Sequence, residues 1–91
     1  MLSGFNTEIL HEGTVYHVQT ESRKGTGIET AVYVKGAVIH SLTTSHHELV
    51  EPSHDREQKF FELSGEQHRH VIAQIRAGEI RFPAMPSRGA G

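Results

Sequence analysis

The longest regular pattern of apolar positions lies in residues 55–77 and has the period of an α-helix. At 100° per residue, one stripe about 120° wide collects most of the apolar side chains. The stripe contains Phe60, Phe61, Ser64, His68, Val71, Ile72 and Ile75. The opposite side contains Gln58, Lys59, Glu62, Glu66, Arg69 and Arg76. The pattern therefore predicts one long amphipathic helix that lies on a sheet, with both phenylalanine rings in the core.

Four shorter segments before this helix alternate between apolar and polar positions, as strands do. They are residues 6–12, 15–21, 28–34 and 37–43. Gly13 and Gly36 each permit the positive φ of a tight turn, so two-residue hairpin loops are predicted at 12–13 and 35–36. With such a loop, Ile9 faces Tyr16 and Leu10 faces Val15. We predict an α+β fold, in which two hairpins make an antiparallel four-stranded sheet and one long C-terminal helix packs on one face.

Both faces of the predicted sheet carry apolar residues. In the first hairpin, one face contains Ile9, His11, Tyr16 and Val18, and the other contains Glu8, Leu10, Val15, His17, Gln19 and Glu21. In the second hairpin, the same pattern assigns Val32, Val34, Ala37 and Ile39 to one face, and Ala31, Tyr33, Val38 and Leu42 to the other. One helix covers one face. The second face is then partly exposed, covered by residues 44–52, or buried against another molecule.

The remaining segments set the boundaries of the domain. Residues 22–27 (SRKGTG) are interpreted as a flexible hairpin connection, with an anion-binding or partner-binding loop as the alternative. Residues 44–53 are interpreted as a linker. Gly65 inside the helix indicates a kink or a close backbone approach, and Gly78 is suited to the position after the helix end. We expect Ile80 and Phe82 to fold back onto the core, giving a single domain over residues 1–82 and a disordered tail over 83–91.

The composition limits the possible functions of the chain. It has 91 residues, of which 35% are hydrophobic and 22% charged, so one domain with a small core is expected. The absence of cysteine excludes disulfides, thiolate metal sites and a cysteine nucleophile. A formal net charge of −2 gives no electrostatic drive toward nucleic acid or an anionic membrane. There is no apolar run of signal-peptide or membrane-spanning length, so we expect a cytoplasmic protein.

Eight histidines are the unusual feature of this composition. His46, His47 and His54 share one predicted loop, but Glu51 stands where the zinc motif H-E-x-x-H requires its second histidine. Solvated histidines are therefore expected rather than a metal site. Protonation of all eight would change the net charge from −2 to about +6, which predicts sensitivity to acid.

His68 differs from the other histidines because it falls within the apolar stripe. We interpret it as a core residue with a ring nitrogen bonded to the backbone or to a hydroxyl. A contact with Tyr16 or Tyr33, or a proton-sensitive switch, are the alternatives. The chain has no G-x-S-x-G motif and one aspartate, Asp55, so neither an enzyme nor a cofactor is predicted.

Five segments of the chain form a distinctive set: residues 5–8 (FNTE), 16–21 (YHVQTE), 28–30 (IET), 66–68 (EQH) and 75–78 (IRAG). In these segments the chain resembles a family of small bacterial proteins found among deltaproteobacteria, and within it the RomX-type polarity regulators. The similarity covers most of residues 5–78. RomX-type proteins act with a response regulator on a Ras-like GTPase of the MglA type and promote its GTP-bound state. The resemblance thus implies a non-enzymatic protein-interaction module in bacterial cell polarity.

An exchange-promoting protein needs a surface that binds the nucleotide-free or GTP-like form of the GTPase better than the GDP form. The predicted partner-binding residues are His17, Gln19 and Glu21 on one sheet face, flanked by Arg23 and Lys24, with Tyr33 as an apolar anchor. The alternative is a homodimeric structural or small-ligand-binding protein that uses its open sheet face.

Overall fold

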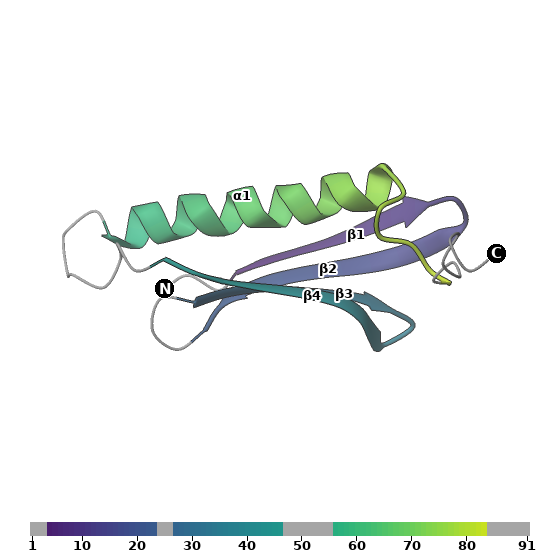
Figure 1. Cartoon of the computed structure of the whole chain (residues 1–91), viewed down its shortest axis with the longest axis horizontal. Helices are drawn as coiled ribbons and strands as arrows, with labels where there is room; N and C mark the ends of the chain where they lie inside the picture. Colours follow the sequence, from purple (N-terminus) through teal and green to yellow (C-terminus); the bar gives the residue numbers. More distant parts are fainter. Residues whose placement is uncertain (1–3, 24–26, 47–55, 84–91) are drawn as a thin grey trace, which may run out of the picture.

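The chain folds into one antiparallel sheet followed by one helix (Figure 1). The computed structural model describes residues 4–23, 27–46 and 56–83. The strands are β1 (Phe5–His11), β2 (Thr14–Ser22), β3 (Gly27–Val34) and β4 (Ala37–Ser45), in the sheet order β1-β2-β3-β4, and the helix is α1 (Arg56–Arg76). This is the predicted α+β fold. Within the described residues, α1 lacks the apolar character that a membrane-spanning helix requires.

Both hairpins turn at the positions predicted from their glycines, residues 12–13 and 35–36. Ile9 pairs with Tyr16 and Leu10 with Val15, as a two-residue loop requires. The loop residues all have positive φ: 52° at Glu12 and 83° at Gly13 in the first hairpin, and 54° at Lys35 and 83° at Gly36 in the second. This left-handed geometry matches the twist of the flanking strands and fixes the register of each hairpin.

A β-bulge between β3 and β4 changes which residues of β4 face the helix. Tyr33 pairs with Val38, but the preceding residue of β3, Val32, pairs with His40, so Ile39 is the extra residue. From there to the end of β4 the alternation is shifted by one position. Leu42 therefore pairs with Thr30 and packs against the core, and its predicted place beside Tyr33 on the other face is wrong.

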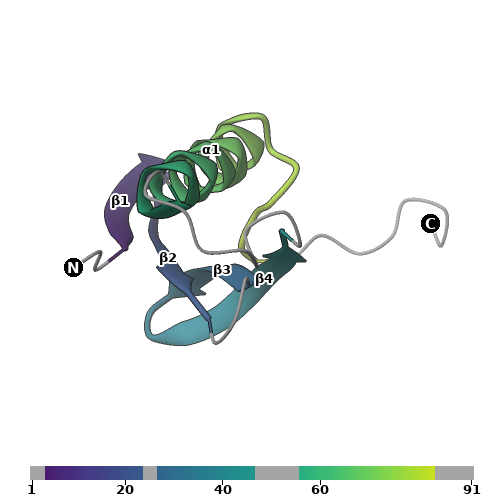
Figure 2. The same cartoon turned by 90° about the vertical axis from the view of Figure 1, so that its left-hand side faces the viewer.

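Helix α1 packs on the inner face of the sheet, mainly over β1 and β2 (Figure 2). The main core cluster lies between them and consists of Ile9, Tyr16, Val18, Val32, Val34, Val71, Ile75 and Ile80. A second small cluster joins Ile28 to Phe60 at the start of the helix.

Phe61 was expected in the core, but its side chain is 49% exposed. It lies at one border of the apolar stripe and rests on the ring of Phe5, with the ring centroids 5.2 Å apart.

The end of the helix carries the segment that folds back on the sheet. Gly78 has a φ of 80° and its N–H donates to the Ile75 carbonyl, while the Glu79 N–H donates to Gln74. This is a Schellman motif, as Gly78 predicted. Ile80 is buried, as expected. The Phe82 N–H donates to the Tyr16 hydroxyl at 2.9 Å, so the chain returns to β2, but Phe82 is 39% exposed and its expected place on the core is wrong.

Other predictions concern residues outside the described ranges. These are the connection at 24–26, most of the linker, and the tail after Pro83. The linker was expected to begin at residue 44, but Thr44 and Ser45 belong to β4, so its predicted start is wrong.

Candidate functional site

The face of the sheet opposite α1, here called the outer face, carries exposed apolar side chains. Leu10 is 73% exposed, Val15 52% and Val38 57%. They come from β1, β2 and β4, so the apolar surface extends across the sheet and is not confined to one strand. Large apolar side chains gathered on one uncovered face are typical of a surface that contacts another molecule.

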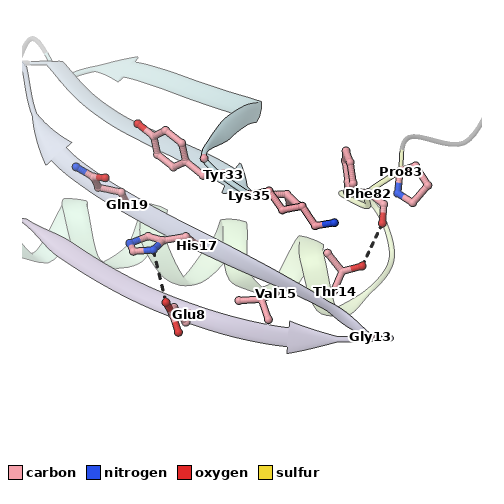
Figure 3. Close-up of a pocket in the computed structure, with 12 residues that line it drawn as sticks. Glu8, Gly13, Thr14, Val15, His17, Gln19, Tyr33, Lys35, Phe82 and Pro83 are labelled. Atoms are coloured by element: carbon pink, nitrogen blue, oxygen red, sulfur yellow. Dashed lines mark hydrogen bonds and ion pairs between the residues drawn. The ribbon is translucent and has the colours of Figure 1, made fainter.

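A groove of about 880 Å³ lies on this face, at the end of the sheet where the two hairpins turn (Figure 3). Its floor is formed by β2 and β3 and one side by β1. The Phe82 and Pro83 segment closes the end near the first hairpin. The side chains that line the groove include Glu8, Val15, His17, Gln19, Tyr33, Lys35, Phe82 and Pro83. The groove therefore combines aromatic and aliphatic surface with one carboxylate and one ammonium group.

Two hydrogen bonds hold the closing segment in place. The Thr14 hydroxyl donates to the Phe82 carbonyl at 3.3 Å, and the Phe82 N–H donates to the buried hydroxyl of Tyr16. Both partners belong to β2, next to the first hairpin. The end of the groove is thus fixed to the strand that forms its floor.

His17 is at the centre of the polar contacts in the groove. Its Nδ1 lies 3.9 Å from the Glu8 carboxylate, and its Nε2 lies 3.3 Å from the side-chain oxygen of Asn6. The ring meets Tyr33 edge to face, with 6.4 Å between centroids and an interplanar angle of 86°. Such contacts orient the imidazole and the phenol for recognition, because neighbouring rings and hydrogen bonds restrict their rotamers.

The structure brings together three of the predicted partner-binding residues. His17, Gln19 and Tyr33 all line the groove. Glu21 and Arg23 lie toward the other end of the sheet. There Arg23 Nη1 is 3.6 Å from the Glu21 carboxylate and 3.2 Å from that of Glu29. Glu21 and Arg23 thus form, with Glu29, a separate surface ion-pair cluster. The predicted Lys24 lies outside the described residues.

Several groove residues were not selected from the sequence. Glu8 and Val15 had been assigned to the correct face by strand alternation, but nothing in the sequence distinguished them as binding residues. Lys35 was assigned to a turn. Phe82 was expected on the core, and its position beside the outer face depends on the path of the chain after α1.

The core contains a second group of polar residues, here called the polar seam. Each strand contributes a threonine to it and α1 contributes two side chains: Thr7, Thr20, Thr30, Thr44, Gln67 and His68. His68 Nε2 lies 2.8 Å from the Thr7 hydroxyl, and Nδ1 lies 2.8 Å from the Thr20 hydroxyl. The expected hydroxyl partner of His68 is confirmed, with one hydroxyl on each ring nitrogen.

Gln67 completes the polar seam on the side of β3 and β4. Its amide nitrogen donates to the Thr30 hydroxyl at 3.1 Å, and also to the backbone carbonyls of Ile28 and Leu42. Its amide oxygen accepts from the Thr44 hydroxyl at 2.5 Å. Since buried polar groups are stable only when they are hydrogen-bonded, these contacts allow a glutamine and a histidine to lie in the core.

Burial lowers the pKa of His68 from its usual value, and the neighbouring Arg69 guanidinium lowers it further. The side chain is only 4% exposed, so the neutral imidazole is favoured and a ligand in solvent has little access to it. Among the described residues, no three His, Asp or Glu side chains are placed to hold a metal ion. We therefore regard the outer-face groove, and not the polar seam, as the candidate site.

Comparison with known proteins found no match: no family model matches the chain, and no curated protein or solved structure is significantly similar to it.

Proposed function

We propose that this protein is a non-enzymatic protein-interaction module that binds a partner protein through its outer face. The observation that carries the proposal is the uncovered apolar surface formed by Leu10, Val15 and Val38 beside a groove of about 880 Å³. Burial of apolar area contributes about 25 cal/mol per Å², so a partner that covers this face gains a favourable free energy.

The groove has the composition of a protein-binding surface. Tyr33 is half-buried, lines the groove and meets the His17 ring edge to face. Aromatic residues of this kind dominate the binding energy of many interfaces. Glu8 and Lys35 lie at the border of the apolar surface, where exposed charges contribute more to the choice of partner than to affinity.

The partner class that we propose is a Ras-like GTPase of the MglA type, whose GTP-bound state the protein would promote in the bacterial cytoplasm, together with a response regulator. The support for this class is the resemblance of residues 5–78 to RomX-type polarity regulators. The physical requirement is that the protein binds the nucleotide states of the GTPase with different affinities. A ligand that binds both states equally does not change the equilibrium between them.

The decisive experiment measures binding of the purified protein to an MglA-type GTPase loaded with GDP or with a non-hydrolysable GTP analogue. We expect tighter binding to the GTPase loaded with the GTP analogue than to the GDP-loaded form. We also expect the protein to accelerate the release of a fluorescent GDP from the GTPase. Tyr33→Ala should weaken binding about tenfold, which corresponds to about 1.4 kcal/mol. The matched control is His70→Ala, because His70 is exposed on α1, away from the outer face.

Two outcomes would contradict the proposal at different levels. Absence of binding to either form of the GTPase would remove this partner class. Binding that is unchanged by Tyr33→Ala and by Val15→Asp, with both variants folded by circular dichroism, would show that the outer face is not the binding surface.

A further inference from the structure

Strand β4 is an edge of the sheet. Among the described residues its only neighbouring strand is β3, and no described strand pairs with the backbone N–H and C=O groups on the other side of β4. After the bulge at Ile39, pairing with β3 is regular from His40 to Ser45. A regular, unpaired edge is a template for the addition of another strand.

The sequence of β4 lacks the features that usually protect such an edge. Its residues, AVIHSLTTS, include no Lys, Arg, Asp, Glu or Pro, and the bulge lies near the hairpin end of the strand. Helix α1 packs mainly over β1 and β2, at the other side of the sheet (Figure 2). As a result Leu42 and Ile39 are only partly buried. Within the described residues, the outer face of β4 and its backbone edge are therefore available to a partner, and its inner face is only partly covered.

We propose that a second copy of this chain occupies this edge, by antiparallel pairing of β4 with β4. A strand without charged side chains is complementary to itself, because antiparallel self-pairing places no like charges opposite each other. The two-fold axis is then perpendicular to the sheet, so the two outer faces lie on the same side and form one continuous surface. This inference does not rest on the proposed function, because it uses the strand edge and not the groove.

Pairing centred on Leu42 fits the burial pattern of β4. It places Leu42 opposite Leu42 of the second copy on the inner face, where each side chain is partly buried in one copy alone. Ser41, exposed on the outer face, then lies opposite Thr43 of the second copy. The two helices do not collide, because each lies over the β1 and β2 side of its own sheet (Figure 2).

The other edge of the sheet, β1, is less suited to self-pairing. Its central residue is Glu8, with an exposed carboxylate, and self-pairing around it would place two negative charges opposite each other. At its start, Phe5 is in contact with Phe61 of α1, so the helix lies beside this edge.

The first test is the mass of the full chain in solution, measured by light scattering at micromolar concentration. We expect twice the chain mass of 10.1 kDa. The double variant Ser41→Lys with Thr43→Lys should have the mass of a monomer, because it places lysines opposite each other. The corresponding Ser41→Glu with Thr43→Glu variant should also be monomeric, and an equal mixture of the two should recover the dimer.

A matched control distinguishes the edge from the outer face. Val15→Lys with Gln19→Lys places the same two charges on the outer face of β2, an inner strand of the sheet, and should remain dimeric. A cross-linking test then locates the contact. Because the chain has no cysteine, Leu42→Cys introduces a single thiol, which should form a disulfide-linked dimer under mild oxidation.

Three outcomes would overturn the proposal. The first is a wild-type chain that is monomeric over the whole concentration range. The second is a dimer that dissociates in the β2 control variant but persists in the β4 lysine variant, since this would place the interface on the outer face. The third is a Glu8→Cys variant that cross-links more efficiently than Leu42→Cys, since this would place the interface at β1.

Discussion

The hydroxyl oxygen of Thr20 on β2 lies 2.8 Å from Nδ1 of His68 on α1, and 2.6 Å from the hydroxyl of Thr30 on β3. This contact lies between the two apolar clusters of the core, one around Val18 and the other around Ile28. An apolar stripe alone allows a helix to slide or rotate on a sheet. Hydrogen bonds from α1 to a threonine of every strand favour one position, because any other would leave buried polar groups unpaired.

Thr20→Val tests the polar seam directly. Valine has nearly the same shape as threonine, but it leaves Nδ1 of His68 and the Thr30 hydroxyl without this partner. We expect a loss of about 1–3 kcal/mol in the free energy of unfolding, measured by urea denaturation. Ser22→Ala is the control, since Ser22 is an exposed hydroxyl residue of β2 outside the seam and outside β4, and it should change stability by less than about 0.5 kcal/mol. Equal effects of the two substitutions would contradict a stabilising role for the seam.

The lowered pKa of His68 predicts how stability depends on pH. Its folded pKa lies below the unfolded value of 6.5, so the unfolded chain binds more protons between these two values. The free energy of unfolding is therefore not reduced by His68 above pH 6.5, where the imidazole is neutral in both states. It decreases as the pH falls from 6.5 toward the folded pKa. His68→Gln should reduce the slope of stability against pH in this window, and the exposed His70→Gln should not. An unchanged slope in His68→Gln would show that other groups control the acid response.

The two adjacent phenylalanines of α1 should differ in their contribution to stability. Phe60 is buried, so Phe60→Ala should cost about 3–5 kcal/mol. Phe61 is half exposed and its main contact is the ring of Phe5, so Phe61→Ala should cost about 1 kcal/mol. Chemical denaturation of the two variants measures the difference. Similar costs would mean that both rings are in the core.

Replacing Gly65 and Gly78 by alanine should change the stability of the protein in opposite directions. A Cβ at Gly65 would lie 3.4 Å from Cζ of Phe5 and 3.1 Å from Nη1 of Arg69, which is the mobile end of a long side chain. Gly65→Ala should therefore stabilise the protein by up to about 1 kcal/mol through helix propensity. Gly78 has a φ of 80°, so Gly78→Ala should destabilise it by about 1 kcal/mol. Thermal unfolding of both variants tests the pair, and a destabilised Gly65→Ala variant would show that the close approach of Phe5 requires glycine.

The sequence alone determined the elements and most of their faces. Alternation of period two and a helical stripe are local properties, and each turn glycine specified its hairpin, so the pairing of Ile9 with Tyr16 followed directly. The outer-face positions of His17, Gln19 and Tyr33 followed from the same alternation. The presence of His68 in the helical stripe also indicated that a polar group would be satisfied in the core.

Only the tertiary structure decided the features that depend on contacts between distant segments. The bulge at Ile39 moved Leu42 to the core face. The placement of α1 near β1 left Phe61 at the border of the contact between the helix and the sheet. The return of Phe82 to β2 closed one end of the groove. The polar seam joins five segments, and Gln67 belongs to it although the predicted apolar stripe did not include it. Periodicity gives the direction of a side chain within its own element, whereas burial depends on which other elements lie above it.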